Sequence, residues 1–283
     1  MNVALEKIMK VIDIEPVEEN LFRGSCEDSA HVFGGQVLAQ AISAAFQTVD
    51  PSRRLHAVHA YFLTAGDWQA PILYEVQRIR DGRSFNTRLV VAFQHGRAIF
   101  NLSSSWHKKE SGFEHTMPMP HVPPPDALRD DRDAYLDIAR QQGVKKHGIF
   151  RYDAIDSRQV EGIPSNDNEV LPAAKHTWMR TRDKLDDNPR IHLCLMAYMS
   201  DMDFMNTSKR PHNIGAHAKM IQGASLDHAL WIHRPFRVDE WLLFAKESPN
   251  AHGARGFVRG HFFREDGTLV ATAAQECLIR LRR

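Results

Sequence analysis

Two long segments of the chain alternate between apolar and polar residues with a period of two, which is the spacing of half-buried β-strands. One covers residues 59–106 and the other covers residues 228–276. Each holds an alternating run, a break that contains proline, a second run, a turn that contains glycine, and a long hairpin arm. The turn dipeptides, His-Gly at 95–96 and Asp-Gly at 266–267, favour tight hairpins. The pattern predicts four antiparallel strands that occur twice.

A segment of unusual composition precedes each copy. The first is FGGQVLAQAISAAFQTV, residues 33–49, and the second is RIHLCLMAYMSDMDFM, residues 190–205. Both are apolar or small on most faces, which is typical of a buried helix. A buried helix followed by four antiparallel strands, used twice, predicts an α+β fold in which a sheet wraps around a helix in each of two units.

The rest of the chain connects and extends these units. An amphipathic helix is predicted near the N-terminus. Residues 117–130, MPMPHVPPPDALRD, predict an extended surface linker, because successive prolines favour extended backbone. We expect a helix over 130–142 and strands over 148–160 and 175–182. The predicted domains are a first unit over residues 1–110, a Pro-rich linker with a short helix over 111–147, and a second unit over 148–283 that carries the candidate catalytic residues.

Composition narrows the class of protein. The chain has 283 residues, of which 43% are hydrophobic and 25% charged, and its net charge is +1. It has no long basic run, so we expect no nucleic-acid partner. No apolar run reaches the length of a membrane span, so we expect no membrane insertion. Cys26, Cys194 and Cys277 are widely spaced, which indicates reduced thiols and a cytoplasmic location.

Several common catalytic motifs are absent from the sequence. There is no G-x-S-x-G, no H-E-x-x-H and no paired Cys/His spacing, which argues against a serine hydrolase and a zinc enzyme. The Gly-Gly at 34–35 opens a predicted helix and could bind an anion or allow close packing. Arg255 and Arg259 could meet phosphate, although a solvated strand edge explains them as well.

An aspartate in the second predicted helix raises a question. At helical spacing, Asp201 shares a face with Ile191, Cys194 and Tyr198, and a carboxylate on a core-facing stripe is costly unless it is paired. One alternative is that the helix ends early and leaves Asp201 near water. The other is that Asp201 belongs to a constellation of polar groups in the second unit. Ser225 at the start of a buried strand and Gln275 in an apolar strand are its candidate partners, although each could be a satisfied core polar residue.

Several stretches of the chain resemble those of a known family. The strings LFRGSCED, VFGGQVLAQA, RDGRSF, SDMDF, LDHALWIHRPF, ARGFVRGHFF and DGTLVATAAQE are similar to those of the acyl-CoA thioesterase II family, the TesB-like enzymes. The resemblance extends from about Leu21 to the C-terminus. It implies a double hotdog fold, hydrolysis of acyl-CoA to a free fatty acid and CoA, and no metal or organic cofactor. It also implies a homo-oligomer, a dimer or a tetramer.

The resemblance assigns roles to three residues. Asp201 matches the family's acid, which activates a water molecule, Ser225 matches the hydroxyl, and Gln275 matches the amide. Many bacterial members carry Thr at the position of Ser225, so the hydroxyl here loses the methyl group that restricts its rotamer. Asp203 is interpreted as a bystander. We expect the backbone N–H groups of Gly35 and Gln36, at the start of the first helix, to bind the oxyanion.

The internal repeat predicts a single catalytic centre per chain. The first helix has no acid, and an offset of 171 residues sets Ser104 opposite Gln275, whereas an offset of 169 sets His56 opposite Ser225. The first unit then supplies pocket walls. Two alternatives stay open: a non-catalytic acyl-CoA-binding sensor with the same fold, and a hydratase-type hotdog, whose paired Asp and His on another loop do not occur here.

Overall fold

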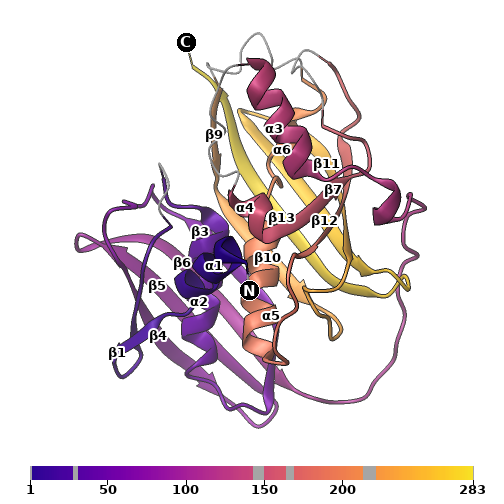
Figure 1. Ribbon diagram of the computed structural model, residues 1–283. Helices are drawn as coiled ribbons and strands as arrows, with labels where there is room; N and C mark the ends of the chain where they lie inside the picture. The colour runs from indigo at the N-terminus through magenta and orange to yellow at the C-terminus, as the bar shows by residue number, and fades with distance from the viewer. Residues whose placement is uncertain (1, 28–30, 143–149, 164–168, 213–220, 283) are drawn as a thin grey trace.

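The computed structural model describes residues 2–27, 31–142, 150–163, 169–212 and 221–282. These residues form two units, each with a central helix and an antiparallel sheet, and the two sheets join into one sheet of 13 strands (Figure 1). The strand order along the sheet is β1-β2-β4-β5-β6-β3-β10-β13-β12-β11-β8-β7, with β9 also paired to β13. The predicted α+β double hotdog is confirmed.

The first unit forms from the N-terminal part of the chain. Its elements are α1 (Val3–Ile12), β1 (Glu15–Glu18), β2 (Leu21–Gly24), α2 (Gly34–Phe46), β3 (Arg53–Phe62), β4 (Ile72–Asp81), β5 (Phe85–Gln94) and β6 (Arg97–Lys108). The amphipathic α1 buries Leu5, Ile8, Val11 and Ile12, as its sequence predicts.

The second unit repeats this arrangement after a connecting segment. The segment contains η1 (Pro125–Ala127), α3 (Asp131–Gln142) and α4 (Phe150–Ala154). The unit itself consists of β7 (Ile155–Gln159), β8 (Ala174–Thr181), α5 (Pro189–Ser200), α6 (Asn206–Lys209), β9 (Ile221–Ser225), β10 (Asp227–Ile232), β11 (Leu242–His252), β12 (Arg255–Arg264) and β13 (Leu269–Leu281).

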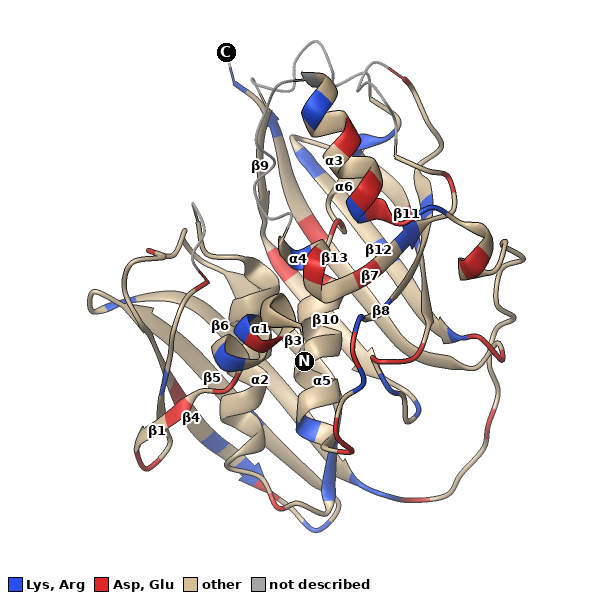
Figure 2. Ribbon diagram, viewed as in Figure 1, with Lys and Arg blue, Asp and Glu red and all other residues tan. Residues whose placement is uncertain are grey.

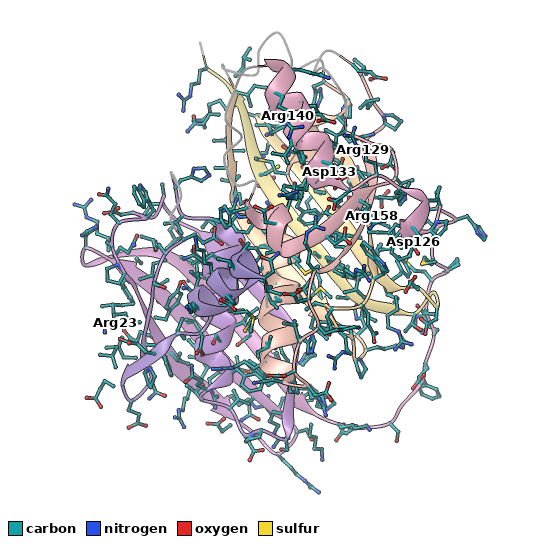
Figure 3. All side chains as sticks on the ribbon, in the orientation of Figure 1. Arg23, Asp126, Arg129, Asp133, Arg140 and Arg158 are labelled. Carbon is teal, nitrogen blue, oxygen red and sulfur yellow. The ribbon has the colours of Figure 1, made fainter. Side chains whose placement is uncertain are left out.

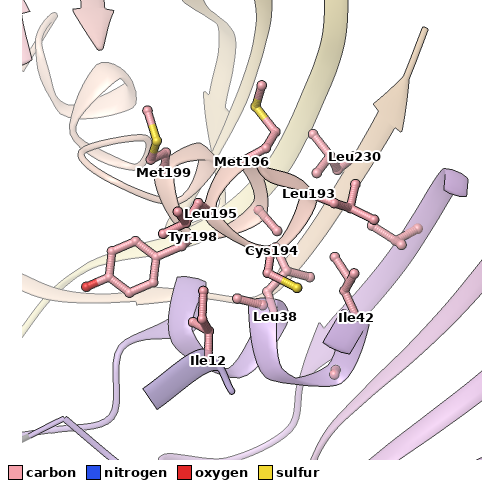
Figure 4. Close-up of a cluster of buried hydrophobic side chains, with 14 of the residues drawn as sticks. Ile12, Leu38, Ile42, Leu193, Cys194, Leu195, Met196, Tyr198, Met199 and Leu230 are labelled. Carbon is pink, nitrogen blue, oxygen red and sulfur yellow. The ribbon is translucent and has the colours of Figure 1, made fainter. Parts of the chain in front are cut away.

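The central helices α2 and α5 pack against each other where the two units meet. Residues 35–45 of α2 and 192–200 of α5 are all buried, as expected for helices that a sheet encloses. Leu38 and Ile42 of α2 lie beside Leu193 and Cys194 of α5 in the apolar cluster of Figure 4. In Figure 2, α2 carries no charged residue, and α5 carries one only in its first turn. This burial fixes the ends of the two helices relative to each other.

The two sheets join through β3 and β10, which pair in antiparallel orientation with His59 opposite Ala229. The backbone N–H of Phe62 also donates to the carbonyl of Leu226, at 3.0 Å. Residues from both units therefore meet near the end of β3.

The register of the strands corrects the alignment of the two copies. A one-residue irregularity in β3 leaves His56 unmatched between Leu55 and Ala57. The second copy has the same irregularity at Leu226, because Ser225 pairs with Cys277 while Ala229 pairs with Ala274. Superposing the irregularities sets Leu55, and not His56, opposite Ser225, an offset of 170 residues. The offset of 171 between Ser104 and Gln275 agrees with the register.

Two predicted elements differ from the structure. The expected strand over 148–160 is a short helix, α4, followed by β7, and its first two residues lie outside the described residues. The Pro-rich stretch packs on the second unit, because Pro125 is buried and the indole N–H of Trp178 donates to the carbonyl of Pro123 at 2.9 Å. The reason is that the outer face of β8 and β11 carries large apolar side chains that need a cover.

Several charged residues of this segment lie at the surface. Figure 3 shows Asp126, Arg129, Asp133 and Arg140 on the outside of the second unit, whereas Asp131 is buried. The helix expected over 130–142 is confirmed as α3, and the strand expected over 175–182 as β8. The predicted boundary between residues 147 and 148 falls outside the described residues, so the domain limits stay a prediction.

Candidate active site

The proposed acid, Asp201, lies directly after the last residue of α5. The helix ends at Ser200 and not at 205, because Asp201 is its C-terminal cap and Asp203 has a left-handed backbone with φ of 57°. The helix does end early, but Asp201 is not exposed to bulk solvent, since only 8% of it is accessible. A carboxylate buried in this way requires hydrogen-bonding partners.

The first of these partners comes from the other unit. The backbone N–H of Gly35, in the first turn of α2, hydrogen-bonds the Asp201 carboxylate. A Cβ added to Gly34 would lie 2.7 Å from Asp201 Oδ2 and 3.0 Å from the ring of Phe62. Glycine at position 34 therefore lets the start of α2 approach the carboxylate.

Ser225 and Gln275 complete a line of polar groups with Asp201. Ser225 Oγ donates to Asp201 Oδ1 at 3.4 Å, and Gln275 Nε2 donates to Ser225 Oγ at 2.8 Å. Ser225 is the last residue of β9 and not the first residue of a strand, whereas Gln275 lies within β13 and is 1% exposed. Leu226, where the register changes, separates β9 from β10 directly after this hydroxyl. The structure thus brings the three predicted residues together.

The line continues through a histidine that the sequence analysis did not single out. His228 Nδ1 lies 2.7 Å from Gln275 Oε1, and its Nε2 lies 2.9 Å from Ser200 Oγ. Burial lowers the pKa of His228 to about 4, so the ring is neutral at pH 7. With the proton assigned to Nδ1, His228 donates to Gln275, which fixes the amide with its N–H toward Ser225. The signal was present in the sequence, since His228 stands three residues after Ser225 on a strand.

Burial determines the acidity of Asp201. Burial raises its pKa to about 6, and the opposing effects of the Gly35 N–H, the charge of Arg151, and the Gln275 and Ser225 side chains reduce that shift. At neutral pH the group is mainly ionised, yet it is a stronger base than an ordinary carboxylate. This combination suits general-base catalysis.

The positive charge of Arg151 lowers the pKa of the acid, and the sequence analysis missed this residue too. Its guanidinium donates to Glu27 Oε2 at 2.7 Å and to the hydroxyl of Tyr198 at 3.0 Å. It also stacks 4.1 Å from the ring centroid of Phe33. Glu27 and Phe33 belong to the first unit and Tyr198 to α5, so Arg151 ties the two units together beside the site.

The N–H groups expected to bind an oxyanion have other partners in this structure. That of Gly35 bonds Asp201, and that of Gln36 donates to the carbonyl of Phe33 at 3.1 Å. The Gln36 side chain instead holds the preceding loop, accepting from the N–H of Glu27 at 3.1 Å and donating to the carbonyl of Ser25 at 3.1 Å. The start of α2 therefore lies against the acid and shapes the site, and the role of Gly35 and Gln36 as oxyanion donors stays a prediction.

Asp203 lies two residues from Asp201 in a very different setting. It forms an ion pair with Lys175 of β8 and accepts from Asn206 at 2.5 Å. Burial alone would raise its pKa, but Lys175 and Lys246 outweigh that effect and hold it at about 2. Two aspartates of one turn thus differ greatly in acidity, as in sites where neighbouring carboxylates have separate roles.

The described part of the chain contains neither a candidate metal site nor a candidate membrane-spanning helix. Within it, no three His, Cys, Asp or Glu side chains gather in a way that could hold a metal ion. Nor does any described helix have the length and apolarity to cross a membrane.

Comparison with known families agrees with this architecture. The profile named "Acyl-CoA thioesterase N-terminal domain" matches residues 23–107, and the one named "Acyl-CoA thioesterase" matches residues 158–278. The chain is 38% identical to "Acyl-CoA thioesterase 2" of Haemophilus influenzae over 99% of both chains. It is 38% identical to "Acyl-coenzyme A thioesterase 8" of Mus musculus, covering 97% of this chain and 89% of that protein.

A solved structure is similar over the same length. The acyl-CoA thioesterase II TesB2 of Mycobacterium marinum shares 37% identity, with a TM-score of 0.82 over 97% of this chain and 98% of that chain. The fold and the site define a tandem hotdog enzyme with a buried carboxylate between its two units. The chain belongs to the acyl-CoA thioesterase II family and is, by homology, a thioester hydrolase that acts on acyl-CoA.

Proposed function

We propose that the protein hydrolyses fatty acyl-CoA to a free fatty acid and CoA through a water molecule that Asp201 deprotonates and that Ser225 and Gln275 orient. The observation that carries this proposal is the hydrogen-bonded line from Gln275 through Ser225 to Asp201. It ends on a buried carboxylate whose pKa, raised to about 6, suits a general base.

The reaction needs no covalent intermediate. Asp201 takes a proton from water as the water oxygen bonds to the thioester carbonyl carbon. The tetrahedral intermediate then collapses, the carbon–sulfur bond breaks, and the leaving thiolate of CoA receives the proton from Asp201. A thioester carbonyl is electrophilic enough for an activated water, and holding that water in place lowers the entropic part of the barrier.

Release of CoA thiol from acyl-CoA esters of increasing chain length tests the proposal. We expect turnover without added metal, and the same turnover with a chelator present. Activity that a chelator abolishes and zinc restores would contradict a mechanism that uses only side chains. Binding of acyl-CoA with no release of thiol would favour a non-catalytic sensor.

The amide and its counterpart in the first copy form a matched pair of variants. We expect Gln275→Ala to lower kcat by about 10²–10³-fold, the scale for loss of a positioned polar group in an active site. Ser104, opposite Gln275 in the repeat, accepts from the indole N–H of Trp106 at 3.0 Å and has no acid to serve. Ser104→Ala should therefore lower stability by about 1–3 kcal/mol with little change in kcat.

Both variants are to be measured at saturating substrate, with melting temperatures recorded. If Ser104→Ala stays folded and loses as much activity as Gln275→Ala, the site is shared by both units and the single-centre proposal fails.

Location and assembly belong to the same proposal. Cys26, Cys194 and Cys277 are free thiols, which supports a cytoplasmic location, although one relative is named a peroxisomal acyl-coenzyme A thioester hydrolase. A homo-oligomer, dimeric or tetrameric, is also proposed.

A further inference from the structure

A second pocket opens at the opposite end of the central helices from Asp201. Its volume is about 500 Å³, which is within the range of small-molecule sites. It lies beside Phe46 at the end of α2 and Pro189 at the start of α5. Because α5 has 12 residues at 1.5 Å each, the pocket is roughly 18 Å from Asp201.

The repeat identifies this pocket as the counterpart of the proposed active site. The active site lies between the end of α5 and the start of α2, and the second pocket lies between the end of α2 and the start of α5. Leu55 lines it at the position opposite Ser225, and Ile232 lines it at the position opposite Phe62, both by the offset of 170 residues. The two sites are thus related by the approximate twofold symmetry of the chain.

The second pocket differs from the proposed active site in the side chains that line it. Its floor, formed by Leu55 and Phe46, is apolar: Leu55 replaces the hydroxyl of Ser225, and α2 is capped by Gln47 where α5 is capped by Asp201. It therefore lacks counterparts of both Asp201 and Ser225. The fold has kept a cavity there, but the pair of side chains proposed to activate water does not recur in it.

The rim of the pocket carries an excess of positive charge. Six basic residues line it against two acids, Asp187 and Glu110; the six are Arg53, Arg54, Lys108, Lys109, Arg234 and Arg237. Two of the six, Arg54 and Lys109, are exposed and form no ion pair among the described residues. An apolar floor with a cationic rim is complementary to a ligand that has an apolar chain and an anionic head.

We propose that this second pocket binds an acyl-CoA without hydrolysing it, with the acyl chain on the apolar floor and the phosphates at the rim of Arg54 and Lys109. The choice of ligand rests on the proposed function, because a counterpart of an acyl-CoA site would hold the same class of molecule. Each chain then binds two acyl-CoA molecules and hydrolyses one.

Calorimetric titration with a dodecyl thioether of CoA, which has no thioester to cleave, tests this stoichiometry. We expect two molecules bound per chain, and weaker binding at the second site as salt is raised. The double variant Arg54→Glu/Lys109→Glu should weaken the second site about tenfold or more, because it reverses two charges at the rim. CoA without an acyl chain should occupy the second site more weakly than the thioether.

The matched control is Arg23→Glu, an exposed arginine of the first unit that does not line the pocket. It should keep two sites. A parent protein that binds one equivalent, or a double variant that binds two with unchanged affinity, would overturn the proposal. Thiol release by the parent protein is measured separately, so absence of hydrolysis would count against the proposed function and absence of the second equivalent against the second site.

Discussion

Asp201→Asn is expected to lower kcat by a factor on the order of 10²–10⁴, the usual contribution of a general base. Asparagine keeps the shape of the side chain and can still accept hydrogen bonds from Ser225 and Gly35, but it cannot take a proton. KM should change little, because the variant removes an interaction that matters in the transition state. Thiol release at saturating substrate measures the effect, and equal kcat in the variant and the parent would exclude Asp201 as the base.

The pH profile of the parent enzyme provides an independent check on the same residue. Because Asp201 must be ionised to accept a proton and its pKa is raised to about 6, kcat/KM should rise with pH through about 6 and then level off. An increase in kcat/KM near pH 4 instead would mean that an ordinary exposed carboxylate controls the reaction. In Asp201→Asn the increase through about pH 6 should disappear.

The contribution of Asp201 to the free energy of unfolding should fall as pH rises, whereas activity should increase. A carboxylic acid whose pKa is raised on folding stabilises the protein at low pH and loses that contribution as pH rises through about 6. Asp201→Asn removes the cost of burying the charge, so its stability relative to the parent should be greater at pH 8 than at pH 5. Urea unfolding at the two pH values measures this difference, and no change between them would argue that Asp201 is not buried as an ion.

Asp203→Asn is expected to destabilise the protein by about 3–5 kcal/mol at pH 7, because it leaves the buried ammonium of Lys175 without its partner. Asparagine tolerates the left-handed backbone, φ of 57°, so the substitution tests the charge and not the turn. The kcat of the folded variant should fall far less than that of Asp201→Asn. Urea unfolding and thiol release on the same preparation separate the two effects.

Two further measurements bear on this ion pair. Since its folded-state pKa is depressed to about 2, Asp203 stabilises the protein above about pH 4 and loses this contribution as pH falls toward 2. The difference in the free energy of unfolding between the parent and Asp203→Asn should therefore become smaller in acid. The double variant Lys175→Met/Asp203→Asn, which removes the unpaired ammonium and keeps a residue that tolerates the left-handed turn, should be more stable than Asp203→Asn. If it is less stable, the loss does not come from an unpaired charge.

Asp203 also shows where a sequence interpretation stops. Helical spacing and the family resemblance identify Asp201 as the important acid and Asp203 as a bystander. The structure shows Asp203 as a partly buried group, paired with Lys175, at the turn that ends α5. Lys175 lies on β8, 28 residues earlier, and only the packing of the sheet around α5 brings the two together.

The chain's own pattern determined the repeated architecture. Alternating runs, turn dipeptides and two largely apolar helices predicted the double unit, because periodicity and hydrophobicity are local properties that a fold with a buried helix cannot violate. The resemblance then pointed to Asp201, Ser225 and Gln275. Only the tertiary structure decided the rest: the irregularity that sets Ser225 opposite Leu55, the contact of Gly35 with the acid, and the line through His228. These depend on strand register and on which groups share a buried space, and neither is encoded in any one stretch of residues.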